Sequence, residues 1–476
     1  MAAASGLASA ARALRRWADA AIAAGLYAVA AAVGLASVAA VNAQGLLSGE
    51  EVSVSLLDVV AVPGRFQPTV YATNFAGHVQ FWLFSHLDPS FDLFYGRTWK
   101  ALAMALVAPL VHATLRRRLG CGRGPAALGA LAAVLLPGVG AVAWLATENG
   151  LEVVWGLAAL LLATSQRRVW VLAPVAAGVA VSSYGAGLAW AGAVGALVAV
   201  RLVRSPSRVR HLRAVLAASA AGLAVVLVPL VWWEGGGRIV LGGGSVGSAD
   251  PVAALRSLGG ELFVRGESYY YFTDAPALGS PWLAGVLAVA VVAGTALRPR
   301  LWPWTLALVL TVVLYALSGG VLGVRRAVAI PVLVALALAV VVDVLARRRA
   351  PLARLLLVTA AGVAVLGPLG GQYLDIRDGW RTGRYALPRD FDFPIAEGAT
   401  MAEEVTALTG RLNSGAATYR EIAAEREGER SLAMAWLLAV RRGGDLTGLA
   451  TPEQIGDLVA ESPRCTADCR PVPGRP

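Results

Sequence analysis

Long apolar runs limit the fold of this sequence more than any other feature. About eleven runs of roughly 16 to 22 residues are long enough, as helices, to cross a hydrocarbon core of roughly 30 Å with some tilt. Backbone groups that cross a bilayer must be paired internally, so the runs predict an all-α polytopic membrane protein. The runs lie near residues 20–41, 98–115, 126–144, 150–165, 169–183, 186–203, 212–232, 281–297, 302–318, 326–346 and 353–369.

Composition supports the same class of protein. The chain is 57% hydrophobic and only 15% charged, against roughly 25% charged residues in soluble domains. A formal net charge of +11 in a soluble protein would indicate nucleic-acid binding. Here the arginines stand in short clusters between the apolar runs, so we expect membrane lipids and not nucleic acid as partners.

The arginine clusters alternate with the loops that carry acidic and aromatic residues. Cytoplasmic loops of membrane proteins are enriched in Arg and Lys, so the sequence predicts a cytoplasmic N-terminus and an extracytoplasmic C-terminus. Lys100 is the only lysine, a bias typical of a GC-rich bacterial genome, and we expect the bacterial cytoplasmic membrane. The clusters lie in "RALRRW" near the N-terminus and in residues 116–124, 166–168, 201–213, 298–300 and 346–354.

Two predicted outer loops, 42–97 and 232–280, are longer than a connection requires, which favours a functional role. The first contains "GHVQFWLFSHLDPSFDLFYGR", whose helical spacing predicts short helices in the membrane interface. We predict a transmembrane domain over 1–369 and a small, mostly helical extracytoplasmic domain over 370–476. Its "CTADC" segment can close a disulfide between Cys465 and Cys469 if its compartment is oxidising.

Four stretches occur in an order that resembles the GT-C superfamily of integral-membrane glycosyltransferases, which includes protein O-mannosyltransferases and aminoarabinose transferases. They are "SGEEVSVSLLDVV", "TNFAGHVQFWLF", "FYGRTWKAL" and "LGVRRAVAIPVL". The resemblance covers residues 15–345 and implies a polyprenyl-phosphate-linked sugar donor, an envelope glycan, lipid or protein as acceptor, and inversion at the sugar carbon. The chain departs from the family pattern in having Glu-Glu and His-Val where Asp and His-Pro are usual.

Glu50 and Glu51 follow the first apolar run and are the first candidates for catalysis. Sugar transfer needs a base for the acceptor proton and cationic donors for the departing phosphate. A second carboxylate beside the base and partial desolvation would raise its proton affinity. We therefore predict that one of the two is the general base, the alternative being an exposed pair of loop acids.

Three other acids are weaker candidates. Asp58 shares a helical face with the pair if that segment is helical. Glu148 and Glu152 face the same way at the start of a helix, where the resemblance implies an acid near the active centre, although helix-dipole complementarity also explains them. Glu51 and Glu148 suit a hard divalent cation, but two acids from distant loops make no metal motif, so no cofactor is predicted with certainty and a divalent cation stays open.

Cations and aromatic residues complete the predicted site. Arg325 and Arg326 form the only arginine pair at a predicted outer helix mouth, where a lipid phosphate would fit their guanidinium groups, the alternative being an interfacial anchor. Arg97, at the mouth of the second span, is a candidate for pairing with Asp92 or the acidic centre. His78 and Tyr270 are candidates for substrate contact, although each also suits ordinary interfacial packing.

Two other functional classes compete with a glycosyltransferase. A transporter or flippase of lipid-linked envelope intermediates would place ionisable residues near the midplane and show internal repeats. The apolar runs are nearly free of charge and no repeat is evident, which argues against a transporter. A ligase or polymerase of the O-antigen class would centre on a late outer loop, and the early acidic loop favours the transferase.

Overall fold

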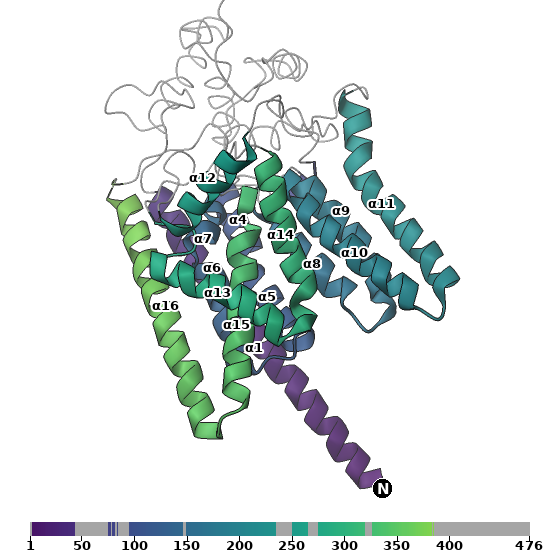
Figure 1. The fold of residues 1–476 in the computed structure, drawn as a ribbon, viewed down its shortest axis with the longest axis horizontal. Helices are drawn as coiled ribbons and strands as arrows, with labels where there is room; N and C mark the ends of the chain where they lie inside the picture. The colour runs from purple at the N-terminus through teal and green to yellow at the C-terminus, as the bar shows by residue number, and fades with distance from the viewer. Residues whose placement is uncertain are drawn as a thin grey trace, which may run out of the picture.

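The structure is a computed structural model that describes residues 2–42, 75–77, 79–80, 83, 95–145, 149–234, 250–264, 275–318, 326–382 and 384. Every regular element in these ranges is a helix, and the helices lie side by side in one bundle (Figure 1). The all-α fold predicted from the apolar runs is therefore confirmed for this part of the chain.

Seven helices within the described ranges are long and apolar enough to cross a membrane, namely Trp17–Val41, Gly96–Arg117, Gly185–Arg204, Arg208–Pro229, Pro299–Leu317, Ala329–Arg347 and Pro351–Arg381. Four predicted spans correspond to shorter apolar helices, Arg123–Leu135, Leu151–Ala163, Arg168–Ser183 and Pro281–Leu297. That the chain crosses the membrane eleven times therefore remains a prediction.

The helices follow the order of the apolar runs. The first half of the bundle consists of α1 (Ala2–Asn42), α4 (Tyr95–Ala105), α5 (Val107–Arg117), α6 (Arg123–Leu135), α7 (Pro137–Ala143), α8 (Leu151–Ala163), α9 (Ala173–Ser183) and α10 (Leu188–Arg204). The second half consists of α11 (Arg208–Glu234), α12 (Pro251–Phe263), α13 (Pro281–Leu297), α14 (Trp302–Leu317), α15 (Ala329–Arg347) and α16 (Pro351–Arg381).

A proline explains the break between α6 and α7. Leu136 has φ −61° and ψ 128°, an extended conformation, and it directly precedes Pro137. The proline ring disfavours helical geometry in the residue before it. One apolar run thus becomes two helices, because hydropathy alone does not register this restriction.

The core lies around α15, while α11 and α16 lie at the edges of the bundle (Figure 1). The span of α15 is 83% buried, against 22% for the span of α11 and 11% for that of α16. Exposed leucines and valines on both edge helices form apolar surface that suits contact with lipid tails.

Glycines allow α9 and α11 to approach closely. A Cβ atom added at Gly178 would lie 2.4 Å from the carbonyl oxygen of Gly222, and one added at Gly222 would lie 2.5 Å from that of Pro174. Small residues at such positions let helix backbones touch, which is the usual way helices associate in membranes.

Arginines join several loops at one end of the bundle. The Arg298 guanidinium donates to the Leu119 carbonyl at 2.5 Å, and Arg118 donates to Leu161 at 3.1 Å. Arg201 donates to the carbonyl of Ala163 at 2.5 Å. We call this end of the bundle the arginine-rich end. We call the opposite end the outer end, because the charge bias predicts that it faces outward. The predicted grouping of these loops agrees with the contacts, while the side of the membrane stays a prediction.

Two details differ from the sequence-based expectations. Helix α16 continues to Arg381, so the predicted domain boundary at 369/370 falls inside a helix. Helix α12 lies within the loop 232–280, for which no helix was expected. The Val252 N–H donates to the Asp250 carboxylate at 2.8 Å, which caps α12. The C-terminal part of the predicted tail, with Cys465 and Cys469, lies outside the described residues.

Candidate active site

Most residues predicted for the site lie outside the described part of the chain, so their positions stay predictions. Arg97 and Arg326 are described, and so is Glu152. The residues outside are Glu50, Glu51, Asp58, His78, Glu148, Tyr270 and Arg325.

Two buried cations begin helix α4. Arg97 and Lys100 are each 0% exposed and lie three residues apart, on one face of the helix. The Lys100 ammonium donates to the carbonyl of Asn149. Cations near a helix N-terminus oppose the helix dipole, and burying them costs free energy unless they are paired. Their placement therefore requires polar partners at the outer end of the bundle.

A buried carboxylate begins helix α8, which packs against α4. Gly150 has φ +90°, a conformation that glycine adopts without strain, and it turns the chain into α8 directly after Asn149. Glu152, in the first turn of α8, is 1% exposed, where a negative charge complements the helix dipole. Arg97, Lys100, Asn149 and Glu152 make up what we call the outer polar cluster.

Two described residues of the predicted first outer loop, Ala76 and Gln80, are bound to the same end of the bundle. The backbone N–H of Ala76 donates to the Ser182 hydroxyl at 3.1 Å. The Gln80 amide donates to the Ser183 hydroxyl at 3.4 Å and accepts from the Trp155 indole at 3.4 Å. These contacts hold Ala76 and Gln80 against α8 and α9.

Arg326 lies at the outer end as well. It is partly buried in the short turn that precedes α15. Helix α7 packs against both α4 and α15, and a Cβ atom added at Gly138 of α7 would lie 3.1 Å from the Pro331 ring. Helix α7 therefore contacts both the first turn of α15 and α4, the helix that carries Arg97 and Lys100.

The apolar runs are nearly free of charge, as the sequence indicates, but the described helices bury four charged residues. Arg97, Lys100, Glu152 and Asp343 are all buried within helices. Arg97 and Lys100 lie within the first five residues of the apolar helix Gly96–Arg117, Glu152 is the second residue of Leu151–Ala163, and Asp343 lies four residues before the end of Ala329–Arg347. None of the four therefore lies at the middle of an apolar helix. Lys100 had a visible signal, being the only lysine of the chain, but its burial depends on Asn149 and could not be read from local sequence.

Within the described ranges, no group of three or more His, Cys, Asp and Glu side chains could hold a metal ion. Glu51 and Glu148, the pair considered for a divalent cation, lie outside those ranges. The divalent cation therefore stays an open prediction.

Comparisons with known proteins identify the fold. No protein-family model matches the chain, and no curated protein matches it. The crystal structure of ArnT from Cupriavidus metallidurans bound to undecaprenyl phosphate matches with a TM-score of 0.53 and 16% identity, over 82% of this chain and 80% of that chain. The apo state of ArnT matches with a TM-score of 0.54 and 17% identity over the same shares. The chain thus shares the fold of ArnT, in agreement with the fold that the resemblance implied.

Proposed function

We propose that this protein transfers a sugar from a polyprenyl-phosphate carrier to a cell-envelope acceptor at the outer face of the membrane. The observation that carries the proposal is the ArnT fold, shared over about four fifths of both chains. That ArnT structure contains undecaprenyl phosphate, the class of lipid that the order of sequence motifs also implies for this chain.

The outer polar cluster supports the proposal chemically. A lipid-linked phosphate must be held where its head meets cations while its tail stays in hydrocarbon. Arg97 and Lys100 begin a membrane-length helix at the outer end, and Arg326 precedes another. In our proposal Arg325 and Arg326 contact the phosphate. Arg97 and Lys100 make the electrostatic potential positive where α4 packs against α8.

The proposed reaction is a single displacement. The acceptor hydroxyl oxygen attacks the anomeric carbon, and the bond from that carbon to the phosphate oxygen breaks with its electron pair moving to the phosphate. The acceptor proton passes to a carboxylate, which we assign to Glu50 or Glu51, with Glu148 as a further candidate. Attack opposite the leaving group inverts the configuration of the sugar.

Other assignments belong to the same proposal. Asp58, His78 and Tyr270 are proposed to contact donor or acceptor from the two long outer loops. Gln80 and Ala76, which dock against α8 and α9, would hold the loop that carries His78. The residues after α16 are proposed to form a small extracytoplasmic domain.

Transport of a lipid-linked intermediate is the competing function, and the buried charges bear on it. A transporter site near the midplane would need ionisable residues at the middle of the spans. The buried Arg97 and Lys100 lie in the first two turns of α4, and Glu152 lies in the first turn of α8. Charges placed at helix ends favour chemistry at the membrane surface.

The deciding experiment incubates the purified full chain with a panel of radiolabelled polyprenyl-phosphate sugars and an envelope acceptor fraction. We expect transfer or hydrolysis with at least one donor. In Glu50→Gln or Glu51→Gln the rate should fall by about 10² to 10⁴-fold, the range for loss of a general base. Asp378→Asn is the matched control, because Asp378 is exposed and pairs with Arg381 on the surface.

Two outcomes would contradict the proposal. One is a folded wild-type protein that acts on none of the donors but moves labelled lipid across a vesicle bilayer. The other is full activity in both Glu→Gln variants. Donor binding gives an independent test, since Arg326→Ala should weaken it whereas Arg300→Ala, exposed at the arginine-rich end, should not.

A further inference from the structure

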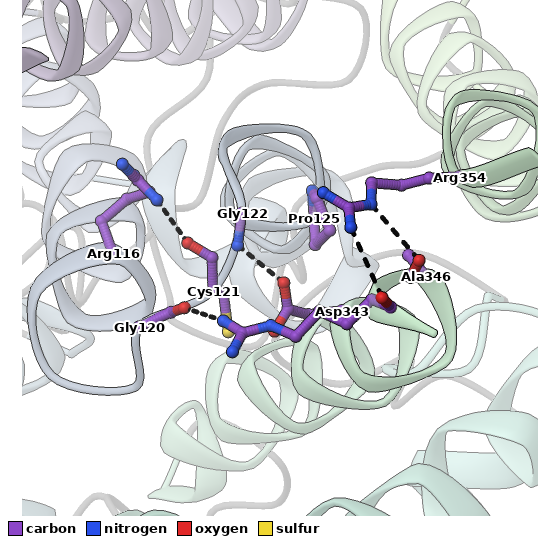
Figure 2. Close-up of a pocket in the computed structure, with 9 residues that line it drawn as sticks. Arg116, Gly120, Cys121, Gly122, Pro125, Asp343, Ala346 and Arg354 are labelled. Carbon is purple, nitrogen blue, oxygen red and sulfur yellow. Dashed lines mark hydrogen bonds and ion pairs between the residues drawn. The ribbon is translucent and has the colours of Figure 1, made fainter. Parts of the chain in front are cut away.

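Asp343 is the centre of a polar cluster at the arginine-rich end (Figure 2). Its carboxylate accepts from Arg347 at 2.7 Å and from Arg298 at 3.1 Å, and it accepts the backbone N–H of Gly122 at 2.7 Å. The Asp343 side chain is 3% exposed. The residue therefore ties the last turn of α15 to the end of α13 and to the turn between α5 and α6.

A cavity of about 370 Å³ opens beside Asp343. Arg116, Arg347 and Arg354 line it, together with the backbone of residues 120–122, and Asp343 supplies its only lining carboxylate among the described residues. Arg116 and Arg354 reach this site from opposite sides (Figure 2). The cavity thus presents guanidinium groups from three helices to one small volume.

The surrounding charges do not cancel. Asp19 pairs with Arg116 and Arg123, at 3.1 and 2.9 Å, while Asp343 pairs with two arginines as well. Arg354 donates to the carbonyl of Ala346 at 3.3 Å, at the end of α15. Five guanidinium groups therefore accompany two carboxylates. A concave site with such an excess concentrates positive potential and attracts anions.

The cavity adjoins apolar surface that suits acyl chains. Arg354 lies in the first turns of α16, whose span is only 11% buried. Leu352, Leu355 and Leu356 beside it are 69%, 62% and 61% exposed. A ligand held here would meet cations at one end and an apolar helix face at the other, which is the chemistry of an anionic amphiphile.

We propose that this cavity binds the phosphate headgroup of an anionic phospholipid, with its acyl chains lying along α16. Basic pockets between helices at the cytoplasmic surface are suited to anionic headgroups. A guanidinium carries five N–H donors and matches a phosphate with two parallel bonds, so Arg347 and Arg354 can keep their protein contacts and bind the lipid as well. The site is at the opposite end from the outer polar cluster and does not depend on the proposed catalysis.

The test uses the full chain, purified in detergent and depleted of lipid. Native mass spectrometry and thermal unfolding are recorded with phosphatidylglycerol, with phosphatidylcholine and with inorganic phosphate. We expect retention of phosphatidylglycerol and a raised unfolding temperature with that lipid alone. Equal effects of phosphatidylcholine would overturn the proposal. Protection by inorganic phosphate equal to that by phosphatidylglycerol would show a free-phosphate site and overturn the lipid assignment.

Matched variants locate the binding. Arg354→Gln and Arg347→Gln should each weaken phosphatidylglycerol binding about tenfold, the effect of losing about 1.4 kcal/mol. Arg354→Lys should recover part of the binding because it restores the charge. Arg348→Gln removes the same charge from an exposed neighbour that does not line the cavity, and it should bind as the wild type does. Equal losses in Arg348→Gln and Arg354→Gln would show diffuse surface attraction and contradict a site.

Discussion

Asp343 shows how a single buried carboxylate can hold three separate segments of this chain. Its partners come from α13, from its own helix and from the α5–α6 turn. Removing one member of a buried charge network leaves the others desolvated without compensation, which costs more than the network itself contributes.

Asp343→Asn should therefore lower the free energy of unfolding by about 3 kcal/mol, because Arg298 loses its carboxylate while only 14% exposed. Denaturant unfolding in mixed micelles measures the change. Asp378→Asn, in an exposed pair with Arg381, should cost less than about 1 kcal/mol. Similar losses in the two variants would mean that the buried cluster does not stabilise the fold.

Cys121 gives the stability a dependence on alkaline pH. Burial raises its pKa from 9.0 to about 12, and the Asp343 carboxylate adds to the rise. Above pH 9.0 the unfolded thiol loses its proton while the folded thiol keeps it, so the folded state binds more protons and the free energy of unfolding falls as pH rises. Stability should decline by up to about 1.4 kcal/mol per pH unit in this window.

Cys121→Ser removes this contribution, because serine does not titrate there. Its unfolding free energy should fall less steeply than that of the wild type between pH 9.0 and 12. Denaturant unfolding at several pH values, with both proteins in the same detergent, measures the two slopes. Identical slopes would show that the thiol ionises equally in the folded and unfolded states.

Single residues also mark the limit of what the sequence could predict. Arg97 was recognised as a candidate because it stands at a helix mouth, but its complete burial was not foreseen. Asp343 was not a candidate at all, since one acid at the end of an apolar run looks like an ordinary surface charge. Its importance comes from Gly122 and Arg298, and such distant contacts leave no local pattern.

At the level of helices, close packing between α8 and α10 depends on Gly156. A Cβ atom there would lie 2.2 Å from Cδ2 of Trp190, whose side chain is 0% exposed. The indole of a buried tryptophan has little room to move, so an added methyl group must separate the two helices.

Gly156→Ala should destabilise the protein by about 1 to 3 kcal/mol through overpacking. Gly195→Ala is the matched control on α10, because a Cβ atom at Gly195 meets nothing within 4 Å. That change should alter stability by no more than about 1 kcal/mol, in the stabilising direction given the higher helix propensity of alanine. Thermal unfolding of the two variants compares them directly, and equal stability would contradict the packing argument.

Helix existence was largely predictable, and helix boundaries were less so. Apolar length is a local property, so the runs located the seven membrane-length helices. Helix α12 was missed because its apolar face is narrow, although Asp250 followed by Pro251 is a helix-start signal. The end of α16 was placed too early because Asp375 and Asp378 interrupt the apolar pattern without interrupting the helix.

At the level of the whole molecule, the arrangement of loops predicts which positions share a side of the membrane. The arginine-rich loops are joined by hydrogen bonds at one end, while α12 and the end of α16 lie at the other (Figure 1). The fold of ArnT over most of the chain agrees with a multi-pass protein. The charge bias predicts which end of the bundle faces the cytoplasm, and chemical labelling can test this prediction.

Cysteine labelling measures that orientation. In a background without Cys465 and Cys469, Val252→Cys and Thr382→Cys should react with an impermeant maleimide in intact cells. Ser207→Cys should react only after the membrane is permeabilised, while Cys121 stays unlabelled because it is buried. Labelling of residues 207 and 252 from the same side would refute both the topology and the outer location of the proposed site.

The bond between Gly122 and Asp343 also has a consequence for biosynthesis. The two residues are 221 positions apart, so the α5–α6 turn is made long before its partner leaves the ribosome. At roughly 5 to 20 residues per second, that interval lasts about 10 to 45 seconds. During it the early hairpin must persist in the bilayer half-assembled, and a nascent chain that stops short of α15 would present an unfinished turn to the machinery that removes defective membrane proteins.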